Sequence, residues 1–337
     1  DIDKKVLGYK DGQVCFVKAI KALKLHTDEI IKIKTEIGNF LNCTPEHPLL
    51  TITPEGDIEW KKAENLREDE HIAVINEIKV NEEATNLYNI IKDSPLRIAD
   101  KGTISALLKL MKEKRADLGF KLKDYSKFYY NLMPIKIFFE LAKKLNFSYS
   151  EKIRLTDWEG KSRPIILQRQ MDNKLGYILG AMLGDGHIGE RKGHGGEIVF
   201  SDLDRKSITD NFKKIMKETF DVNMKEDKQK GLISYNSALS RILSDLGVIK
   251  GKKAREIRVP KFIFSSSKEC IAGFLKGIFD TDGNAGKYNI SISSVSKKFI
   301  EDLKWLFLRI GILGNIEKRD NKGIILGRKI KESIIYS

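Results

Sequence analysis

The feature of this sequence that most constrains its fold is an internal repeat in the C-terminal half. Residues 200–216 (FSDLDRKSITDNFKKIM) align without gaps on the segment that starts at Ile292 (ISSVSKKFIEDLKWLF), at an offset of 92, and VNMKEDKQKG matches GNIEKRDNKG at the same offset. Upstream, LGYILGAMLGDG (175–186) matches AGFLKGIFDTDG (272–283) at an offset of 97. Each copy reads as helix, strand, strand, helix, strand. Two similar halves in one chain predict a pseudo-twofold arrangement around a shared interface.

Both copies open with a helix that carries small residues along one face. The residues at i, i+4 and i+8 are Gly176, Gly180 and Gly184 in the first copy and Gly273, Gly277 and Thr281 in the second. A glycine inside a helix costs about 1 kcal/mol relative to alanine, so it is not selected for helix stability. Such stripes are useful where two backbones must approach closely. We therefore expect these two helices to pack against each other.

Each stripe leads to an aspartate, Asp185 or Asp282, followed by a glycine that suits the end of a helix. A lone Asp-Gly pair is usually a turn, but here it follows two matching stripes. The helix macrodipole disfavours a carboxylate at this end, and two carboxylates brought together repel each other, so we expect a cation between them. Carboxylate and carbonyl oxygens suit Mg²⁺, which also binds water and phosphate oxygens. At a basic groove this pair predicts phosphodiester hydrolysis by a metal-activated water.

The segments ILGAMLGDG (178–186) and LKGIFDTDG (275–283) resemble the two signature motifs of the LAGLIDADG homing endonucleases, in the single-chain form with two motifs. The resemblance covers roughly residues 165–337. It implies that the motif helices form the core of the interface between the two halves. It also implies that Mg²⁺ or Mn²⁺ is bound by Asp185, Asp282 and the backbone of Gly184 and Thr281.

The resemblance further implies a DNA substrate. In this family the β-sheet of each half lies in the major groove of a long double-stranded site. The two active sites cut both strands across the minor groove and leave 3′ overhangs. The last acidic position of the motif is filled in both copies, by Asp185 and Asp282, which favours an active nuclease over a degenerate one.

The family also places a basic residue near each metal, one of them close to an Ile/Val-Pro pair before the second motif. Here that stretch is GKKAREIRVPKF, and the position where we expect lysine, three before Pro260, is Ile257. This departure leaves the basic catalytic residue open. A lysine on a basic strand is more often a phosphate contact or solvated than catalytic. The candidates are Lys253, Arg258 and Lys261 in this stretch and Lys225 and Lys318 in the matched strand segments.

Residues 1–75 have an all-β pattern, with short β-branched or aromatic runs separated by turns such as KDG, EIGN and PEGD. Within them, CTPEHPLLT (43–51) resembles the TxxH motif of the Hint fold of inteins, and the runs VLGYKDGQVCFVKAI, DEIIKIKT and ENLREDEHIAV resemble the strands around it. The resemblance implies that His47 acts at the amide bond preceding the first residue of an intein. It also implies that Thr44 positions or polarises that bond.

An intein begins with a Cys or Ser nucleophile and ends with Asn. This chain starts at Asp1 and stops at Ser337, and Cys15 falls within a strand of the resemblance and is not expected to replace the nucleophile. We therefore expect no splicing from the chain as given.

From about residue 76 to 165 the pattern changes to helical periodicity, in EEATNLYNIIKD, TISALLKLMKEKRADLG and MPIKIFFELAKKLNF. The net charge is +14, and the basic surplus begins here: residues 1–75 carry −3, residues 76–170 carry +7 and residues 171–337 carry +10. Such a surplus is typical of proteins that bind polyanions. The aromatic residues beside lysines in DYSKFYYNLMPIKIFFELAKKLNF either form a core or contact DNA. We interpret the region as a linker or accessory DNA-binding subdomain.

Composition excludes several other classes. No window approaches the roughly 18 consecutive apolar residues of a membrane span, and the first ten residues lack the apolar core of a signal peptide, so we expect a cytoplasmic protein. Cys15, Cys43 and Cys270 have neither CxxC nor zinc-ligand spacing. We expect them to be buried thiols.

These features predict an α+β protein of three parts: a partial Hint β module over 1–78, a helical linker over 79–165, and a pseudo-twofold LAGLIDADG endonuclease domain over 166–337. Its αββαβ-type repeats are expected at about 171–250 and 268–337. We expect a monomer whose partners are double-stranded DNA and the host protein that flanks an intein, and whose activity is metal-dependent, site-specific DNA cleavage.

Three alternatives remain. The first is a protein-splicing element whose nuclease is inert. The second is an RNA intron maturase, which would have no use for the TxxH module. The third is a regulator that only binds DNA, in which loss of a motif acid would be expected.

Overall fold

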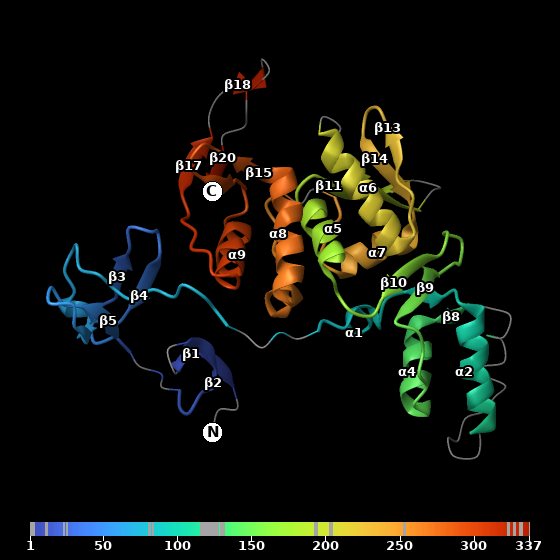
Figure 1. Cartoon of the computed structure of the whole chain (residues 1–337), viewed down its shortest axis with the longest axis horizontal. Helices are drawn as coiled ribbons and strands as arrows, with labels where there is room; N and C mark the ends of the chain where they lie inside the picture. The colour runs from blue at the N-terminus through green and yellow to red at the C-terminus, as the bar shows by residue number, and fades with distance from the viewer. Residues whose placement is uncertain are drawn as a thin grey trace. The chain divides into compact units, whose positions relative to one another are not determined.

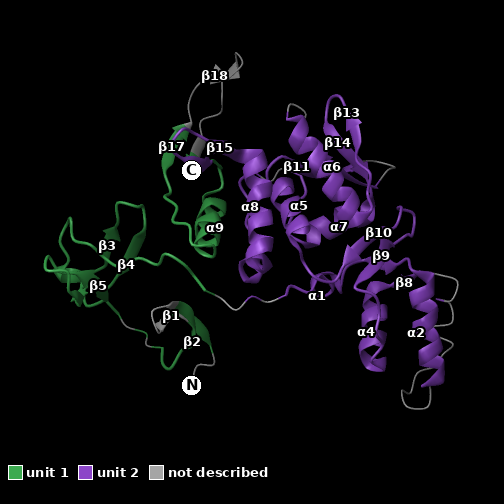
Figure 2. Ribbon diagram, in the orientation of Figure 1, with its two compact units in different colours: residues 1–81, 293–337 green, residues 82–292 purple. Residues whose placement is uncertain are grey.

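The computed structural model forms two compact units, residues 1–81 with 293–337 and residues 82–292 (Figure 2). In sequence, the second unit is inserted between the two parts of the first. Helices and strands together make a mixed α+β protein (Figure 1). The structure describes residues 4–10, 13–22, 24, 26–79, 82, 84–114, 128, 132–191, 195–201, 205–251, 254–321, 324–325, 328–329 and 333–336.

The N-terminal part of the first unit consists of antiparallel hairpins, as its short β-branched runs predict. The pairs are β1 (Lys5–Lys10) with β2 (Gln13–Lys18), β3 (Ile31–Lys34) with β4 (Phe40–Cys43), and β5 (Pro48–Ile52) with β6 (Ile58–Lys62). Gly56 in the last hairpin loop has a φ of 95°, a conformation that favours glycine. The short helix η1 (Ala63–Asn65) follows β6.

The C-terminal part of the same unit contains α9 (Lys297–Leu308) and two short strand pairs. These are β17 (Lys318–Asn321) with β20 (Ser333–Tyr336) and β18 (Ile324–Ile325) with β19 (Arg328–Lys329). Buried Ile78 links this part to the hairpins: its N–H donates to Leu308 O (2.9 Å), and its carbonyl accepts from Arg309 Nη1 (2.9 Å). The two ends of the chain are thereby joined in one unit.

The second unit begins with helices and a four-stranded antiparallel sheet of order β10-β9-β7-β8. The helices α1 (Leu87–Ile91) and α4 (Ile135–Leu145) lie within the runs of helical periodicity, and α2 (Lys101–Glu113) begins two residues before its run. The strands are β7 (Leu96–Ile98), β8 (Met133–Pro134), β9 (Lys152–Asp157) and β10 (Ile165–Gln168). The expectation of a helical linker is therefore corrected to a mixed subdomain.

The expected boundary at residue 165 falls inside this sheet. Leu155 pairs with Ile165, and both side chains are fully buried. The strands are two to six residues long and lie between helices, so their alternation was too short to stand out in the sequence.

An aromatic cluster fills the core of this subdomain. The Tyr88 and Phe138 side chains are buried, and the ring of Tyr149 lies 6.1 Å from Tyr88 and 5.1 Å from Phe138. The Tyr88 hydroxyl donates to Glu151 O (2.9 Å), and burial raises the pKa of this phenol. These aromatic residues therefore form a core. The aromatic residues of DYSKFYY, apart from buried Phe128, lie outside the described residues.

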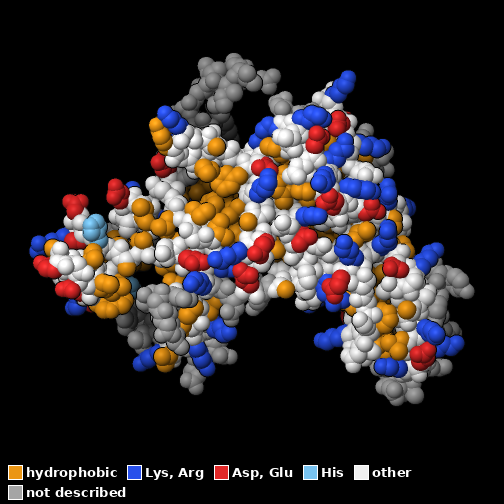
Figure 3. Space-filling view, viewed as in Figure 1, with side chains coloured by type: hydrophobic (Ala, Val, Ile, Leu, Met, Phe, Trp, Pro, Cys, Tyr) orange, Lys and Arg blue, Asp and Glu red, His pale blue; other side chains and the backbone are white. Residues whose placement is uncertain are grey.

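The first copy of the repeat forms a four-stranded antiparallel sheet of order β11-β12-β14-β13 with helices against one face. Its elements are α5 (Asn173–Leu183), β11 (Gly186–Arg191), β12 (Gly195–Phe200), α6 (Lys206–Phe220), β13 (Lys225–Asp227), β14 (Gly231–Tyr235) and α7 (Ser237–Asp245). Phe200 of β12 stacks on Phe212 of α6, with ring centroids 4.1 Å apart. In the space-filling view, Lys and Arg side chains mix with acidic ones over α6 and the β13–β14 hairpin (Figure 3).

The second copy begins in the same order as the first. After η4 (Lys261–Ser265), α8 (Lys268–Asp282) leads into β15 (Gly283–Ala285), which pairs with β16 (Ile290–Ile292). The remaining elements of this copy, from α9 onward, belong to the first unit.

Candidate active site

The helices α5 and α8 pack with their backbones in contact. A Cβ atom added at Gly180 would collide with Phe274 O of α8, and one added at Gly277 would collide with Tyr177 O of α5. Side chains larger than hydrogen at these two positions would push the helices apart. Helix α5 is buried along most of its length, from Leu175 to Leu183.

The other small residues of the two stripes lie along the same contact. A Cβ added at Gly176 would lie 2.5 Å from Cys270 O, and one added at Gly273 would collide with Asn173 O. At the C-terminal end, Gly184 faces Thr281, whose hydroxyl donates to the carbonyls of Gly277 (3.1 Å) and Ile278 (2.9 Å). All six stripe residues therefore lie between the two helices.

The glycines after the two aspartates act differently from the usual glycine at a helix end. Neither Gly186 nor Gly283 has a positive φ, and Gly283 caps α8 in an extended conformation. A Cβ at Gly186 would lie 2.5 Å from Met182 Cα, and one at Gly283 would lie 2.5 Å from Phe279 O. These glycines allow the chain to turn directly from each helix into a strand, close to the helix it has just left.

The packing brings the two motif acids to the same end of the helix pair. A Cβ added at Gly184 would lie 3.2 Å from Asp282 Oδ2, and Asp185 is the next residue in the chain. The Asp282 residue is exposed and Asp185 is partly exposed. Two carboxylates that solvent can reach therefore lie at the end of the helix pair where both helices present their negative ends.

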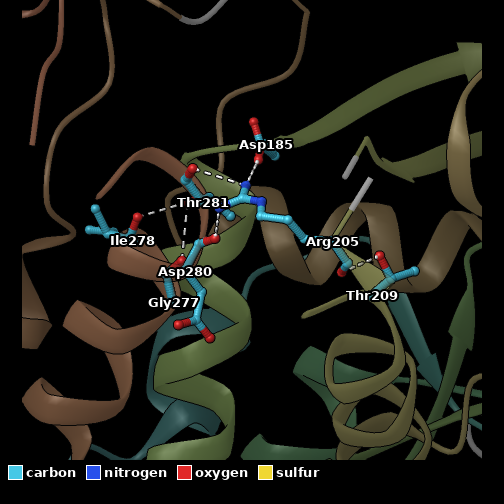
Figure 4. A network of polar contacts seen from close by, with 7 residues as sticks. All are labelled: Asp185, Arg205, Thr209, Gly277, Ile278, Asp280 and Thr281. Atoms are coloured by element: carbon cyan, nitrogen blue, oxygen red, sulfur yellow. Dashed lines mark hydrogen bonds and ion pairs between the residues drawn. The ribbon is translucent and has the colours of Figure 1, made fainter. Parts of the chain in front are cut away.

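A basic residue that the sequence analysis missed lies between these helix ends (Figure 4). The Arg205 guanidinium donates from Nη2 to Asp185 Oδ2 (3.2 Å) and to Thr281 O (3.1 Å). Its Nη1 donates to Asp280 O (2.5 Å). One cationic side chain thus connects the acid of the first motif to the carbonyls at the end of the second motif helix.

The backbone before α6 fixes the position of Arg205. Its carbonyl accepts from the N–H of Thr209 (3.1 Å) and from the Thr209 hydroxyl (3.2 Å), so Arg205 starts the helix. A guanidinium has only donors and cannot cap the N–H groups of α6, so the side chain is available to carbonyl and carboxylate oxygens. The signal that could have revealed it is the repeat itself, since the offset of 92 aligns Arg205 with Lys297, a second basic residue.

The oxygens around Arg205 also suit a divalent cation. Carboxylate and carbonyl oxygens are hard ligands, and the guanidinium shows that this position attracts a positive charge. Among the described residues, no group of three or more His, Cys, Asp or Glu side chains could hold a metal ion. The carboxylate and carbonyl oxygens around Arg205 fit Mg²⁺ or Mn²⁺, which also bind water and phosphate.

The basic candidates from the sequence lie at different places. Lys225 of β13 is exposed. It pairs with Ile233 of β14, which pairs with Val199 of β12, which in turn pairs with His187 of β11. Lys225 is therefore three strand spacings, about 14 Å, from β11. Lys261 and Arg258 are exposed on either side of Pro260. Lys253 lies outside the described residues, and Lys318 lies in β17 of the first unit.

The departure at Ile257 has a structural reason. Ile257 and Val259 are buried and Arg258 between them is exposed, so the side chains alternate along this extended segment. A lysine at 257 would place its ammonium in the core, which is unfavourable without a partner.

The motif residues Thr44 and His47 lie in the first unit, in the turn between β4 and β5. The His47 N–H donates to Thr44 O (3.1 Å), and the His47 carbonyl accepts from the N–H of Ala63 at the start of η1 (2.9 Å). The His47 side chain is exposed and Thr44 is half-buried. The backbone thus holds both residues in one closed turn.

The cysteines differ partly from the expectation of buried thiols. Cys43 and Cys270 are buried, but Cys15 is only half-buried, because it lies in the β1–β2 hairpin beside exposed strand residues. Burial raises the pKa of the Cys270 thiol, which donates to Met171 O (3.5 Å). All three cysteines are free thiols.

Comparison with protein families gives two matches. A model of the intein splicing domain matches residues 2–298, and a model of the LAGLIDADG-like domain matches residues 269–336. The second match begins within α8 and includes Asp282. No helix among the described residues is both long and apolar enough to cross a membrane.

The matches to curated relatives cover most of this chain but only a small part of the length of each relative. Replication factor C small subunit of Methanocaldococcus jannaschii is 26% identical over 324 residues, which is 94% of this chain and 12% of that protein. Elongation factor 2 of Methanopyrus kandleri is 26% identical over 341 residues, 95% of this chain and 26% of that protein. DNA polymerase II large subunit of Thermococcus kodakarensis is 25% identical over 340 residues, 97% of this chain and 18% of that protein. The names describe three different activities, so the similarity of these proteins to this chain is not linked to any one activity.

Proposed function

Since this chain belongs to the intein family and carries a LAGLIDADG-like domain, we propose that it is a site-specific, divalent-metal-dependent DNA endonuclease that makes a double-strand break. The chain is a protein-splicing element with a domain of the homing-endonuclease type. The observation that best supports nuclease activity is that Asp185 and Asp282 lie at the same end of the α5–α8 pair. Both acids that the chemistry needs are present and are reached by solvent.

In this proposal the acids act as ligands. Asp185 and Asp282 would bind Mg²⁺ or Mn²⁺ through carboxylate oxygens, and the backbone carbonyls of Gly184 and Thr281 would supply further oxygen ligands. The metal, when bound, supplies a water of lowered pKa and neutralises charge on the scissile phosphate. The close helix packing holds the carboxylates in position before the DNA arrives, so little ordering is left for the reaction itself.

The sheet of the first copy supplies the DNA-binding face. Its face opposite α6 carries His187, Lys225 and Tyr235, all exposed and joined by the β-sheet register. We place this face in the major groove, where Lys225 contacts a phosphate or base edge away from the cleaved bond. The second copy provides the other half of a long site, and the two cuts leave 3′ overhangs.

The remaining parts have their own proposed roles. Residues 1–78 belong to the splicing module, in which His47 and Thr44 act at an amide bond. The subdomain before α5, within the region that carries a +7 charge, extends the DNA footprint. A monomer with internal pseudo-symmetry is sufficient for both cuts.

The test is cleavage of a plasmid that carries the host-gene sequence without the insertion, with Mg²⁺ or with EDTA. We expect metal-dependent linearisation by the chain, and nicking or no cleavage with Asp185→Asn and with Asp282→Asn. Asp280→Asn is the matched control, because its carboxylate lies at the same helix end but pairs with Lys276 (2.5 Å). It should cut like the unaltered chain.

Two results would contradict the proposal. Specific DNA binding without cleavage in any divalent metal would identify a binding-only domain and leave splicing as the function. Binding of intron RNA in preference to duplex DNA would identify a maturase.

A further inference from the structure

Arg205 occupies the position that a cation would need. Its Nη2 lies 3.2 Å from Asp185 Oδ2 and 3.1 Å from Thr281 O, so one nitrogen sits between a carboxylate of the first motif and a carbonyl of the second. The neighbouring Nη1 is bonded to Asp280 O. Figure 4 shows the guanidinium reaching from the start of α6 to these oxygens.

A metal ion and this guanidinium exclude each other. A divalent cation binds such oxygens at about 2.0 to 2.6 Å, so an ion that touched both oxygens on this side would overlap with Nη2. The two cations would also repel each other, and the helix dipole that attracts one attracts the other. A metal can therefore take these oxygens only after Arg205 has left them.

We propose that Arg205 is an internal counter-cation of the nuclease site, which occupies the metal position between the motif helices and must be displaced before a divalent cation binds there. The inference rests on the proposed function, because it concerns the metal that Asp185 would bind. In the metal-free chain Arg205 balances the charge of Asp185 and of the α8 carbonyls. When displaced, it is a cation beside the cleavage site, where a DNA phosphate is the natural acceptor for a guanidinium.

The side chain is suited to such an exchange. The Arg205 side chain is 42% exposed and Asp185 is 33% exposed, so the ion pair is reached by water and is individually weak. The flexible side chain can turn away while the backbone of Arg205 stays in place at the start of α6, where Thr209 bonds its carbonyl. Displacement therefore requires a rotamer change and not a rearrangement of the helices.

The test is Mn²⁺ binding to the full, metal-stripped chain without DNA, measured by the electron paramagnetic resonance signal of free Mn²⁺. The variant Arg205→Gln should bind Mn²⁺ about two to five times more tightly than the unaltered chain, the upper part of the range expected when an exposed competing ion pair is removed. Arg205→Lys should lie between them, because a lysine has one charged nitrogen and cannot bridge all three oxygens.

The matched control is Lys206→Gln, which removes one positive charge at the adjacent residue. Lys206 pairs with Asp210 (3.4 Å) on the surface of α6, so its loss changes the local field without vacating the metal position. We expect its Mn²⁺ affinity to change by less than about twofold. In the double variant Arg205→Gln with Asp185→Asn, the gain in affinity should disappear.

The outcomes separate this inference from the proposed function. If Arg205→Gln binds Mn²⁺ no more tightly than Lys206→Gln, while keeping the circular dichroism spectrum and melting temperature of the unaltered chain, the counter-cation role is wrong. Metal binding that still depends on Asp185 would then leave the proposed metal site intact. If none of the proteins binds Mn²⁺, including Arg205→Gln, both are wrong. A purely structural Arg205 would give weaker binding on substitution, the opposite of the expected sign.

Discussion

The contact between α5 and α8 can be tested at Gly277. In Gly277→Ala the new methyl group would meet only backbone of the other helix: it would collide with Tyr177 O and lie 2.6 Å from Ala181 N and 3.1 Å from Gly180 C. Backbone atoms cannot rotate away as a side-chain end can, so the two helices must separate. The substitution tests whether the two halves are held together by backbone packing.

The magnitude follows from two opposing effects. Replacing a helical glycine by alanine favours the helix by about 1 kcal/mol. Overpacking a close contact costs about 1 to 3 kcal/mol, and a gap of a fraction of an ångström elsewhere in the interface already loses a quarter to a half of each atomic attraction. The clash with fixed backbone places Gly277→Ala toward the upper end of that cost, so we expect a net destabilisation of about 1 to 2 kcal/mol.

The control is Gly102→Ala in α2, where the added Cβ would meet only Asp100 Oδ1, at an ordinary 3.4 Å. This variant has the helix-propensity gain without the clash, so it should be neutral or up to about 1 kcal/mol more stable. Urea unfolding followed by far-ultraviolet circular dichroism gives both midpoints. If the midpoint of Gly277→Ala is as high as that of Gly102→Ala, the two motif helices are not in backbone contact and the reasoning fails.

Three further predictions concern other parts of the chain. Titration of the native protein with a thiol reagent at pH 8 should modify Cys15 first and Cys270 only slowly, because burial raises the pKa of the Cys270 thiol and leaves little thiolate. Fast labelling of Cys15→Ser but not of Cys270→Ser would contradict the expected order. Asn236→Ala should lower the unfolding free energy by about 1 to 3 kcal/mol, because the buried Asn236 side chain accepts from Leu239 N (2.9 Å) and donates to Arg163 O (2.8 Å). The control Asn284→Ala, at an exposed position, should have little effect in the same unfolding measurement. Lys225→Ala should weaken DNA binding and reduce its salt slope by about 1 without changing the single-turnover cleavage rate at saturating protein; a large loss in that rate would make Lys225 catalytic.

The helix pair could be anticipated from the sequence because a spacing of four residues has one geometric meaning on a helix. In a helix Gly176, Gly180 and Gly184 share one face, and a repeat of the pattern specifies the partner. The reason for the following glycines could not be read in the same way. Gly186 and Gly283 are needed for close approach to their own helices, which depends on where the next strand goes and not on local preference.

The features that the sequence analysis missed leave no periodic pattern of hydrophobic residues in the sequence. The strands β7 to β10 are short and paired across helices, so their partners cannot be inferred from alternation alone. Arg205 is a single residue before a helix, and only the tertiary position of α8 shows which oxygens it meets. The repeat alignment with Lys297 contained the clue, but an aligned basic pair in a lysine-rich chain is too common to single out.

The pairing of α5 with α8 also sets an order of events during synthesis. The two helices are separated in sequence by the whole of the first copy, so their contact is non-local and forms late compared with the hairpins between them. At a translation rate of about 5 to 20 residues per second, α8 follows α5 out of the ribosome by roughly 5 to 20 seconds. For that interval α5, whose residues from Leu175 to Leu183 are buried in the finished protein, has no α8 to cover its glycine face. The helix that leads to Asp185 is thus a segment of the nascent chain that is exposed to aggregation, and a chaperone that delays its collapse would have more effect on the yield of this protein than on its final stability.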